Sequence, residues 1–445
     1  MLNFCINIFF KSLEWTKCKK KTFTSNFCYW FFPERLYLIM VRSFDMKLLK
    51  KAITFAFLSI LMMPVFSGEK YNFSGKPLKD KKSVAFNDCT AMELAEKMRC
   101  GWNLGNTLDA NSKTGLASEE SWHQPLTTKE MIDAVAAAGF KTIRLPCSWA
   151  NHLIDSNYTI DTAWMARVKE IVDWCIEDGL YVILNDHHDN YEREGLMPRG
   201  KGYYPSSLNY NESMLFTKNL WAQISLAFNK GYDEHLIFEL FNEPRLRGHE
   251  HEWWYNQGCT VCRDGAGNLN KLNQIALNTI RASGKNNAKR FIMVTGLAAS
   301  INSYQQDSSW KLPKDTIEDR LLISVHLYTP HSFAMKNPGE TVFMEKHRGE
   351  LVYNFNWLNK HFVSKGIPVI IGEYGATNKN NIEERVKWFE CFVSESHKYN
   401  MVTCLWDNGD WNAKNTFEEK FGFFNRKEKT WYFPEIIDTI MRCSE

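Results

Sequence analysis

The chain lacks a strong excess of either charge. It holds 54 Lys and Arg against 51 Asp and Glu in 445 residues, a formal net charge of +3. Residues 1–67 carry 10 of the basic and 3 of the acidic residues, which leaves 44 against 48, a net charge of −4, for the remainder. No basic surface for a polyanion is indicated, so nucleic acid is not an expected partner.

The chain also lacks a hydrophobic run long enough to span a bilayer. The most apolar stretch, residues 52–65, is shorter than the ~20 residues of a membrane helix and contains Pro64. It follows a basic segment that begins at Met46 and is followed by the small residue Ser67, as in a secretory signal peptide. We therefore expect residues 46–67 to be a signal peptide.

This interpretation leaves residues 1–45 without a role, because a signal peptide normally stands at the N-terminus. We expect translation to start at Met46 or Met40, so that residues 1–45 are an upstream extension that the mature protein does not carry. The mature protein is expected to be secreted (extracellular or periplasmic), not stably inserted in a membrane, and monomeric.

Cysteine is not arranged as a disulfide scaffold. Nine of the twelve cysteines follow Ser67, an odd number at irregular spacing, and several lie within apolar runs where a buried thiol is expected. Cys259-Thr-Val-Cys262 has C-x-x-C spacing but no second pair of this kind. A local disulfide or two free thiols are therefore favoured over zinc, and no metal or other cofactor is expected.

After a linker-like stretch, residues 68–90, short apolar runs alternate with amphipathic segments such as 128–139 and 163–179. Alternation of this kind predicts a parallel sheet of the α/β class, and eight units predict a single (β/α)8 TIM barrel over residues 91–445. No G-x-G-x-x-G follows the first run, which argues against a dinucleotide-binding sheet, and no second domain is visible. The eight runs are 101–104, 142–146, 181–185, 236–241, 291–294, 322–325, 369–371 and 401–406.

Two glutamates follow apolar runs: Glu243 in Phe241-Asn-Glu-Pro244 and Glu373 in Ile371-Gly-Glu-Tyr-Gly375. Active sites of such barrels lie at the carboxyl ends of the strands. Two carboxylates that flank a sugar are the groups that glycoside hydrolysis requires. Each alone is also compatible with an ordinary strand-end acid or a helix N-cap. The other predicted strand ends carry polar or aromatic side chains suited to a sugar site: Asn103, Arg144, His187, His188, Asn242, His326, Tyr328 and Trp406.

Seven strings carry a family resemblance that runs from about Ala91 to Met441. They are Gly101-Trp-Asn-Leu-Gly-Asn-Thr-Leu-Asp109, Ile143-Arg-Leu-Pro146, His187-His-Asp189, Phe241-Asn-Glu-Pro244, Val325-His-Leu-Tyr328, Ile371-Gly-Glu-Tyr-Gly375 and Leu405-Trp-Asp-Asn-Gly409. In this order they resemble the cellulases of glycoside hydrolase family 5, most of all the bacterial endo-β-1,4-glucanase and xyloglucanase branch.

The resemblance implies a retaining enzyme that cleaves internal β-1,4 bonds of cellulose-type glucans or xyloglucan, with Glu243 as general acid/base and Glu373 as nucleophile. Arg144 and Tyr328 would keep Glu373 ionised, while burial beside another carboxylate would keep Glu243 protonated. The implied sugar contacts are Asn242 to the 2-hydroxyl, His187, His188 and His326 as positioning groups, Trp406 as a stacking surface and, more weakly, Asn103.

Three alternatives stay open. A β-mannanase or lichenase would share this catalytic pair, and a non-catalytic carbohydrate-binding barrel is disfavoured by the presence of both carboxylates with Arg144 and Tyr328. A metallohydrolase could use the string His187-His188-Asp189 together with Glu243 and His326, since His and carboxylates are zinc ligands. Adjacent residues of a strand point in opposite directions, however, and the sequence has no obvious third and fourth ligand set.

Two segments depart from the family pattern: His123 and Gln124 in Trp122-His-Gln-Pro125, and the loop 248–268, which contains the Cys pair. Either segment is expected to affect which side chains on a glucan are accepted.

Overall fold

The structure is a computed structural model that describes residues 81–412 and 419–445. The predicted upstream extension 1–45, the signal peptide 46–67 and the first part of the linker, residues 68–80, lie outside the described residues. The described residues all belong to one unit, Gly68–Glu445.

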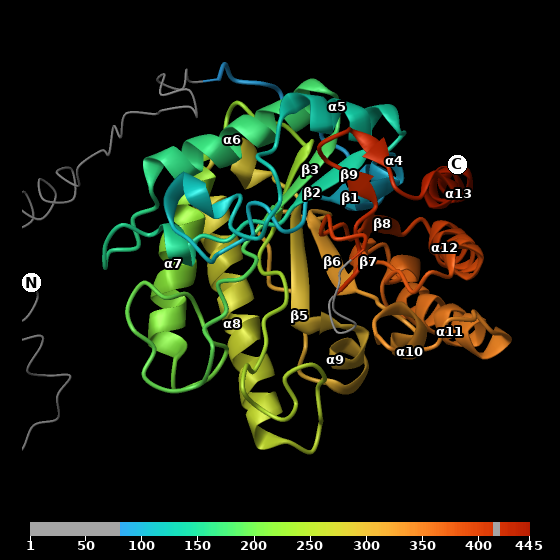
Figure 1. The fold of residues 1–445 in the computed structure, drawn as a ribbon. Helices are drawn as coiled ribbons and strands as arrows, with labels where there is room; N and C mark the ends of the chain where they lie inside the picture. Colours follow the sequence, from blue (N-terminus) through green and yellow to red (C-terminus); the bar gives the residue numbers. More distant parts are fainter. Residues whose placement is uncertain (1–80, 413–418) are drawn as a thin grey trace, which may run out of the picture. The chain divides into compact units, whose positions relative to one another are not determined.

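Eight strands close into a parallel barrel in chain order, because β1 pairs with both β2 and β8. This confirms the predicted (β/α)8 TIM barrel, which Figure 1 shows with helices around the strands. The prediction for 236–241 was too long, since β4 ends at Glu239, and β5 runs farther than predicted. The strands are β1 (Cys100–Asn103), β2 (Thr142–Leu145), β3 (Tyr181–Asn185), β4 (Leu236–Glu239), β5 (Ile292–Ser300), β6 (Leu321–His326), β7 (Val369–Tyr374) and β8 (Val402–Leu405).

The outer helices bury one apolar face each. In α6 (Thr162–Glu177), for example, Asp161 caps the N-terminus and Trp164, Val168 and Ile171 recur at helical spacing on the buried side. The other helices that follow strands are α5 (Lys129–Ala137), α7 (Tyr210–Ala227), α8 (Thr260–Ala282), α9 (Ile301–Gln306), α10 (His331–Ala334), α11 (Glu345–His361), α12 (Ile382–His397) and α13 (Pro434–Ser444). Among the described residues, no helix combines the length and apolarity needed to cross a membrane.

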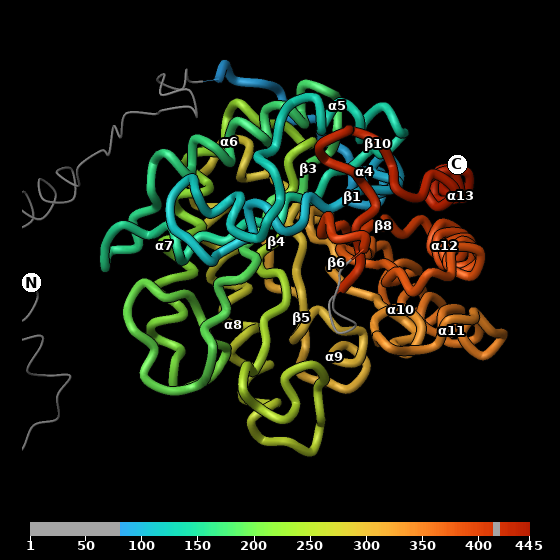
Figure 2. The backbone as a smooth tube through the Cα atoms, in the orientation of Figure 1, coloured from blue at the N-terminus to red at the C-terminus, as the bar shows by residue number. Residues whose placement is uncertain are grey.

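The amino end of the barrel is closed by apolar packing. Helix α4 (Ala91–Met98), capped by Thr90, buries Leu94 and Met98 in a cluster with strand residues such as Ile183 and Ile237. The strand-end residues proposed for the site lie toward the opposite, carboxyl end, where several connections are long. Figure 2 shows one of them, the β4–α8 loop (residues 240–259), as a long winding loop that leads to the start of α8.

Candidate active site

Arg144 joins the groups at the carboxyl end of the barrel. It projects from β2, is completely buried, and donates through Nε to Glu239 at 2.8 Å. Its Nη1 donates to Glu373 Oε1 and to Asn103 Oδ1, both at 2.9 Å, and its Nη2 donates to Asn242 Oδ1 at 2.6 Å. Burial lowers the pKa of Arg144, but Glu239 and Glu373 outweigh it and raise that pKa, so the guanidinium stays charged.

Glu239 is a member of this site that sequence reasoning missed. It is completely buried in β4 and accepts hydrogen bonds from Arg144, from Ser324 Oγ at 2.5 Å and from Asn185 Nδ2 at 3.0 Å. The signal was present, because a single charge inside an apolar strand needs a buried partner.

Glu373 lies on β7 with 5% of its surface exposed. It accepts one hydrogen bond at each oxygen: Oε1 from Arg144 and Oε2 from the Tyr328 hydroxyl, at 2.9 Å in both cases. These are the two donors that the sequence predicted for this carboxylate.

Glu243 follows β4 on the β4–α8 loop rather than standing on the strand itself. Its Oε1 lies 2.8 Å from Nδ1 of His326, which is also 3.6 Å from Glu373 Oε2. One carboxylate oxygen of Glu243 and one of Glu373 lie within 4.8 Å of each other. Gly372 leaves room for this arrangement, since a Cβ there would approach His326 Nε2 to 3.1 Å.

The ionisation order differs from the predicted one. Burial raises the pKa of Glu243, but the hydrogen bond and charge of His326 outweigh it, so the net shift is downward. For Glu373, burial raises the pKa and prevails over His326 and Arg144, which lower it. The sequence predicted the reverse order because it could not place His326 against Glu243.

The two adjacent histidines converge. Cys147 N–H donates to Asn185 Oδ1, which turns Nδ2 of that amide toward Nδ1 of His187 at 3.0 Å. The proton of His187 is therefore on Nε2, 4.0 Å from Glu373 Oε1, and burial lowers the pKa of this histidine well below its usual range. Ligand atoms of His187, His188 and Asp109 lie within 4.8 Å of one another. The prediction that the two side chains point in opposite directions is wrong, because both histidines follow the end of β3 and do not belong to the strand.

A cavity of about 210 Å³ opens over Glu243. Its lining includes His187, His188, Asn242 and the rim residue Trp122, whose ring lies 5.4 Å from that of His188. The other lining residues are Asn111, Asn190, Glu243, Arg245 and Arg247.

Trp406 stands at the end of β8 with its ring nearly parallel to that of His187, at a centroid distance of 5.9 Å. Gly105 allows this position, because a Cβ there would come within 2.9 Å of the indole.

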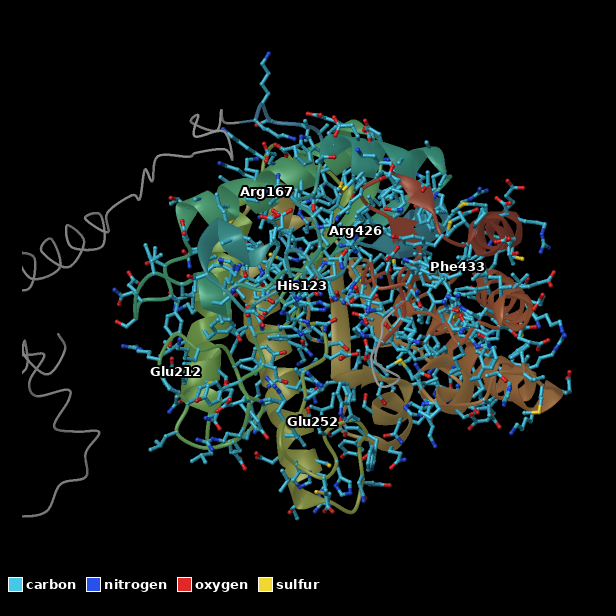
Figure 3. The ribbon with its side chains drawn as sticks, in the orientation of Figure 1. His123, Arg167, Glu212, Glu252, Arg426 and Phe433 are labelled. Atoms are coloured by element: carbon cyan, nitrogen blue, oxygen red, sulfur yellow. The ribbon has the colours of Figure 1, made fainter. Side chains whose placement is uncertain are left out.

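The segment that departs from the family pattern lies at the rim. His123, near the centre of the view in Figure 3, lines two neighbouring cavities. Gln124 is mostly buried and packs against Gly409.

The prediction that Asn103 contacts the sugar is wrong. The Asn103 side chain is completely buried, and Nδ2 donates to the carbonyls of Gly372, Cys404 and Leu405 at 3.0 to 3.2 Å. Its Oδ1 accepts from Arg144, so Asn103 positions the guanidinium instead.

Comparison with known proteins agrees with this geometry. The sequence profile described as cellulase (glycosyl hydrolase family 5) matches residues 107–412. Endoglucanase B of Ruminococcus albus is 44% identical over 358 residues, which cover 80% of this chain and 81% of that protein.

Two solved structures share the fold at 38% identity. The complex of a family 5 lichenase from Caldicellulosiruptor sp. F32 with cellotetraose has a TM-score of 0.75 and covers 83% of this chain and 99% of its own. A broad specificity endoglucanase from Ruminococcus champanellensis with bound cellotriose has a TM-score of 0.73. The match covers 80% of this chain and 100% of that chain. The chain belongs to the cellulase family, glycosyl hydrolase family 5, and is a glycoside hydrolase.

Proposed function

We propose that the chain is a retaining endo-β-1,4-glucanase in which Glu243 is the general acid/base and Glu373 the nucleophile. The observation that carries the proposal is the pair itself: oxygens of the two carboxylates lie within 4.8 Å, and Glu373 accepts from both Arg144 and Tyr328. Retaining pairs are about 5–5.5 Å apart, whereas inverting pairs need about 6.5–9.5 Å to admit a water.

The reaction has two displacements. Glu373 attacks the anomeric carbon while Glu243 protonates the leaving oxygen, which gives a glycosyl ester on Glu373. Glu243, now ionised, takes a proton from a water that attacks the same carbon, and the ester bond breaks to return Glu373 as a carboxylate. Asn242 is proposed to bind the sugar 2-hydroxyl, since Arg144 occupies its Oδ1 and leaves the NH₂ end for the cleft.

Burial lowers the pKa of His326, but the two carboxylates outweigh it and raise that pKa above its usual value. The active form needs a proton on Glu243, which removes one of these two charges, and His326 is proposed to be neutral in that form. Arg144 Nη2 lies 3.3 Å from His326 Nε2, which can accept from this donor only when the ring is uncharged. A neutral His326 no longer lowers the pKa of Glu243 by its charge, although its Nδ1–H can still donate to Oε1, and burial, which raises that pKa, then favours the protonated carboxyl.

The proposed substrates are internal β-1,4 bonds of cellulose-type glucans, with xyloglucan as a further substrate. The names of the relatives support a β-glucan, and the lichenase among the solved structures favours mixed-linkage glucan as a second candidate.

We also propose that the enzyme is exported and begins near Gly68 in its mature form. N-terminal sequencing of protein recovered from outside the cytoplasm tests that start; a mature protein that retains residues 1–45 would refute it.

The experiment that tests the function is a substrate panel. The chain from Gly68 onward is incubated with carboxymethylcellulose, xyloglucan, mixed-linkage glucan and mannan, and new reducing ends are counted. We expect cleavage of the first three with a rapid fall in viscosity, as endo-acting cleavage requires. Activity on mannan alone would establish the β-mannanase alternative, and no activity on any of them would refute the proposal.

The Tyr328 hydroxyl should influence the acid limb of the pH profile. Activity needs ionised Glu373 and is lost as the pH falls through the pKa of that group, which burial raises above its usual value of 4.5. Tyr328→Phe removes a donor to the carboxylate and raises this pKa further, so the acid limb of kcat/KM should move up by roughly 0.5–1 pH unit. Tyr353→Phe on an exposed face of α11 is the control and should leave the profile unchanged. An unchanged profile in Tyr328→Phe would contradict this role.

A further inference from the structure

The β4–α8 loop and the start of α8 bring together two cysteines and two histidines away from the catalytic carboxylates. Cys259 and Cys262 form the C-x-x-C pair. An H-x-H pair precedes it: His249 lies ten residues before Cys259, and His251 lies eleven residues before Cys262. One ligand atom from each of the four lies within 4.8 Å of all the others. The sequence contains no second C-x-x-C pair of the kind a zinc site often uses, and on this loop a histidine pair takes its place.

We propose that these four residues bind one zinc ion, which fixes the β4–α8 loop to helix α8. Two thiolates and two imidazoles form an N₂S₂ set, which zinc binds as a tetrahedron. The Sγ of Cys259 is 3.9 Å from Nε2 of His249, close to the roughly 3.6 Å between S and N ligands of a tetrahedral zinc. Closing the site needs only small movements of side chains.

The start of α8 favours a thiolate at the first cysteine. Cys259 is the N-cap residue of this 23-residue helix, and its Sγ accepts from the backbone N–H of Cys262 at 3.4 Å. The positive end of a helix stabilises a negative sulfur. Both cysteines are free thiols in the structure, so both sulfurs are available as ligands, and binding of zinc releases their protons.

Zinc binding changes the ring proton of each histidine. Nδ1 of His251 is buried without a hydrogen-bond partner among the described residues, while its Nε2 is 3.2 Å from Nδ2 of Asn256. The Oδ1 of that amide accepts from the backbone N–H of Gly258 at 2.9 Å, so Nδ2 faces the ring, and binding of zinc through Nδ1 moves the ring proton to Nε2 and breaks this contact. For His249, binding through Nε2 moves the ring proton to Nδ1, which breaks the bond that Nδ1 accepts from the backbone of His251. Four metal–ligand bonds outweigh these two contacts.

The loop that the zinc would fix also borders the substrate cavity. Arg245 lines the cavity beside Glu243, stacks on the exposed ring of Trp253 at 4.0 Å and pairs with Glu252 at 3.3 Å. Glu252, labelled in Figure 3, lies on this loop. A fixed loop holds Arg245 and Trp253 in place for the glucan, so the zinc has a structural role and does not enter the chemistry.

The test measures metal content in the untagged full chain, purified with a phosphine reductant and dialysed against zinc and then against metal-free buffer. We expect one zinc per chain in the wild type, and background zinc in Cys259→Ser and His251→Ala. Cys391→Ser, which changes a half-buried cysteine elsewhere, and Glu243→Gln, which changes the carboxylate next to His326, should each retain one zinc. Replacement by Co²⁺ should give sulfur-to-cobalt charge-transfer bands that Cys259→Ser lacks.

A second readout separates this site from the catalytic one. Removal of zinc by a chelator should lower the Tm of the wild type but not that of Cys259→Ser, and should raise KM for a long glucan more than it lowers kcat on an aryl cellobioside. Two results would overturn the proposal: zinc content equal in the wild type and in both site variants, or a Cys259–Cys262 disulfide whose reduction is followed by no metal uptake.

Discussion

Replacement of Glu373 by Ala should lower kcat on every glucan by a factor on the order of 10⁴ or more, because no nucleophile remains for the first displacement. Replacement of Glu243 by Ala should be as severe on natural glucan, whose leaving hydroxyl needs a proton, but far milder on an aryl cellobioside whose phenolate leaves without one. Steady-state kinetics of both variants on the two kinds of substrate measure this difference.

Azide distinguishes the two roles further. In Glu243→Ala a small anion can replace the water that lacks its base, so azide should speed the second step and yield a glycosyl azide of retained configuration. In Glu373→Ala azide would attack the anomeric carbon from the side that the Glu373 carboxylate occupies in the wild type. This single displacement would give a glycosyl azide of inverted configuration. Retained product from Glu373→Ala, together with no activity of Glu243→Ala on the aryl substrate, would mean that the assignments are reversed. Glu428→Ala, at an exposed site, is the control.

Replacement of Arg144 by Met should have the second largest effect, on stability as well as on activity. Arg144 is completely buried between Glu239 and Glu373, and its loss leaves two buried carboxylates without their cation. The free energy of unfolding should fall by about 3–5 kcal/mol, as for other buried pairs with one partner removed. Activity should fall by a factor on the order of 10³, because Glu373 is then held less firmly as an anion.

A double variant separates the two effects of Arg144. Glu239→Gln added to Arg144→Met removes the second uncompensated charge and should restore much of the stability seen in urea unfolding, but not the activity. If the double variant recovered both stability and activity, Arg144 would serve the fold alone. A single Arg144→Met variant with wild-type stability would contradict the buried-charge account itself.

The sequence was sufficient to predict the barrel because its strands are short apolar runs separated by amphipathic helices, a pattern that only a few architectures share. It also placed Glu243, Glu373, Arg144 and Tyr328 at one end of that barrel, since the carboxyl ends of parallel strands meet there. These residues do lie together in the structure.

The direction of individual side chains and the contacts between residues far apart in the chain could not be predicted from the sequence. Asn103 points into the barrel under Arg144 rather than toward a sugar, because the register of β1 against β2 decides which side chains face inward. The effect of His326 on Glu243 needs two residues 83 positions apart to meet at 2.8 Å. The histidine pair His249 and His251 stands in the sequence, but only the folded loop brings its ligand atoms within 4.8 Å of those of Cys259 and Cys262.

The most direct test of the central assignment is to trap the glycosyl ester. A 2-deoxy-2-fluoro cellobioside with an activated leaving group slows both displacements, and the leaving group still permits the first, so the ester should accumulate. Mass spectrometry of the digested protein should find one sugar per chain, attached to the peptide that contains Glu373, with none in Glu373→Ala. A sugar attached to any other residue, or product of inverted configuration with no covalent adduct, would contradict the account.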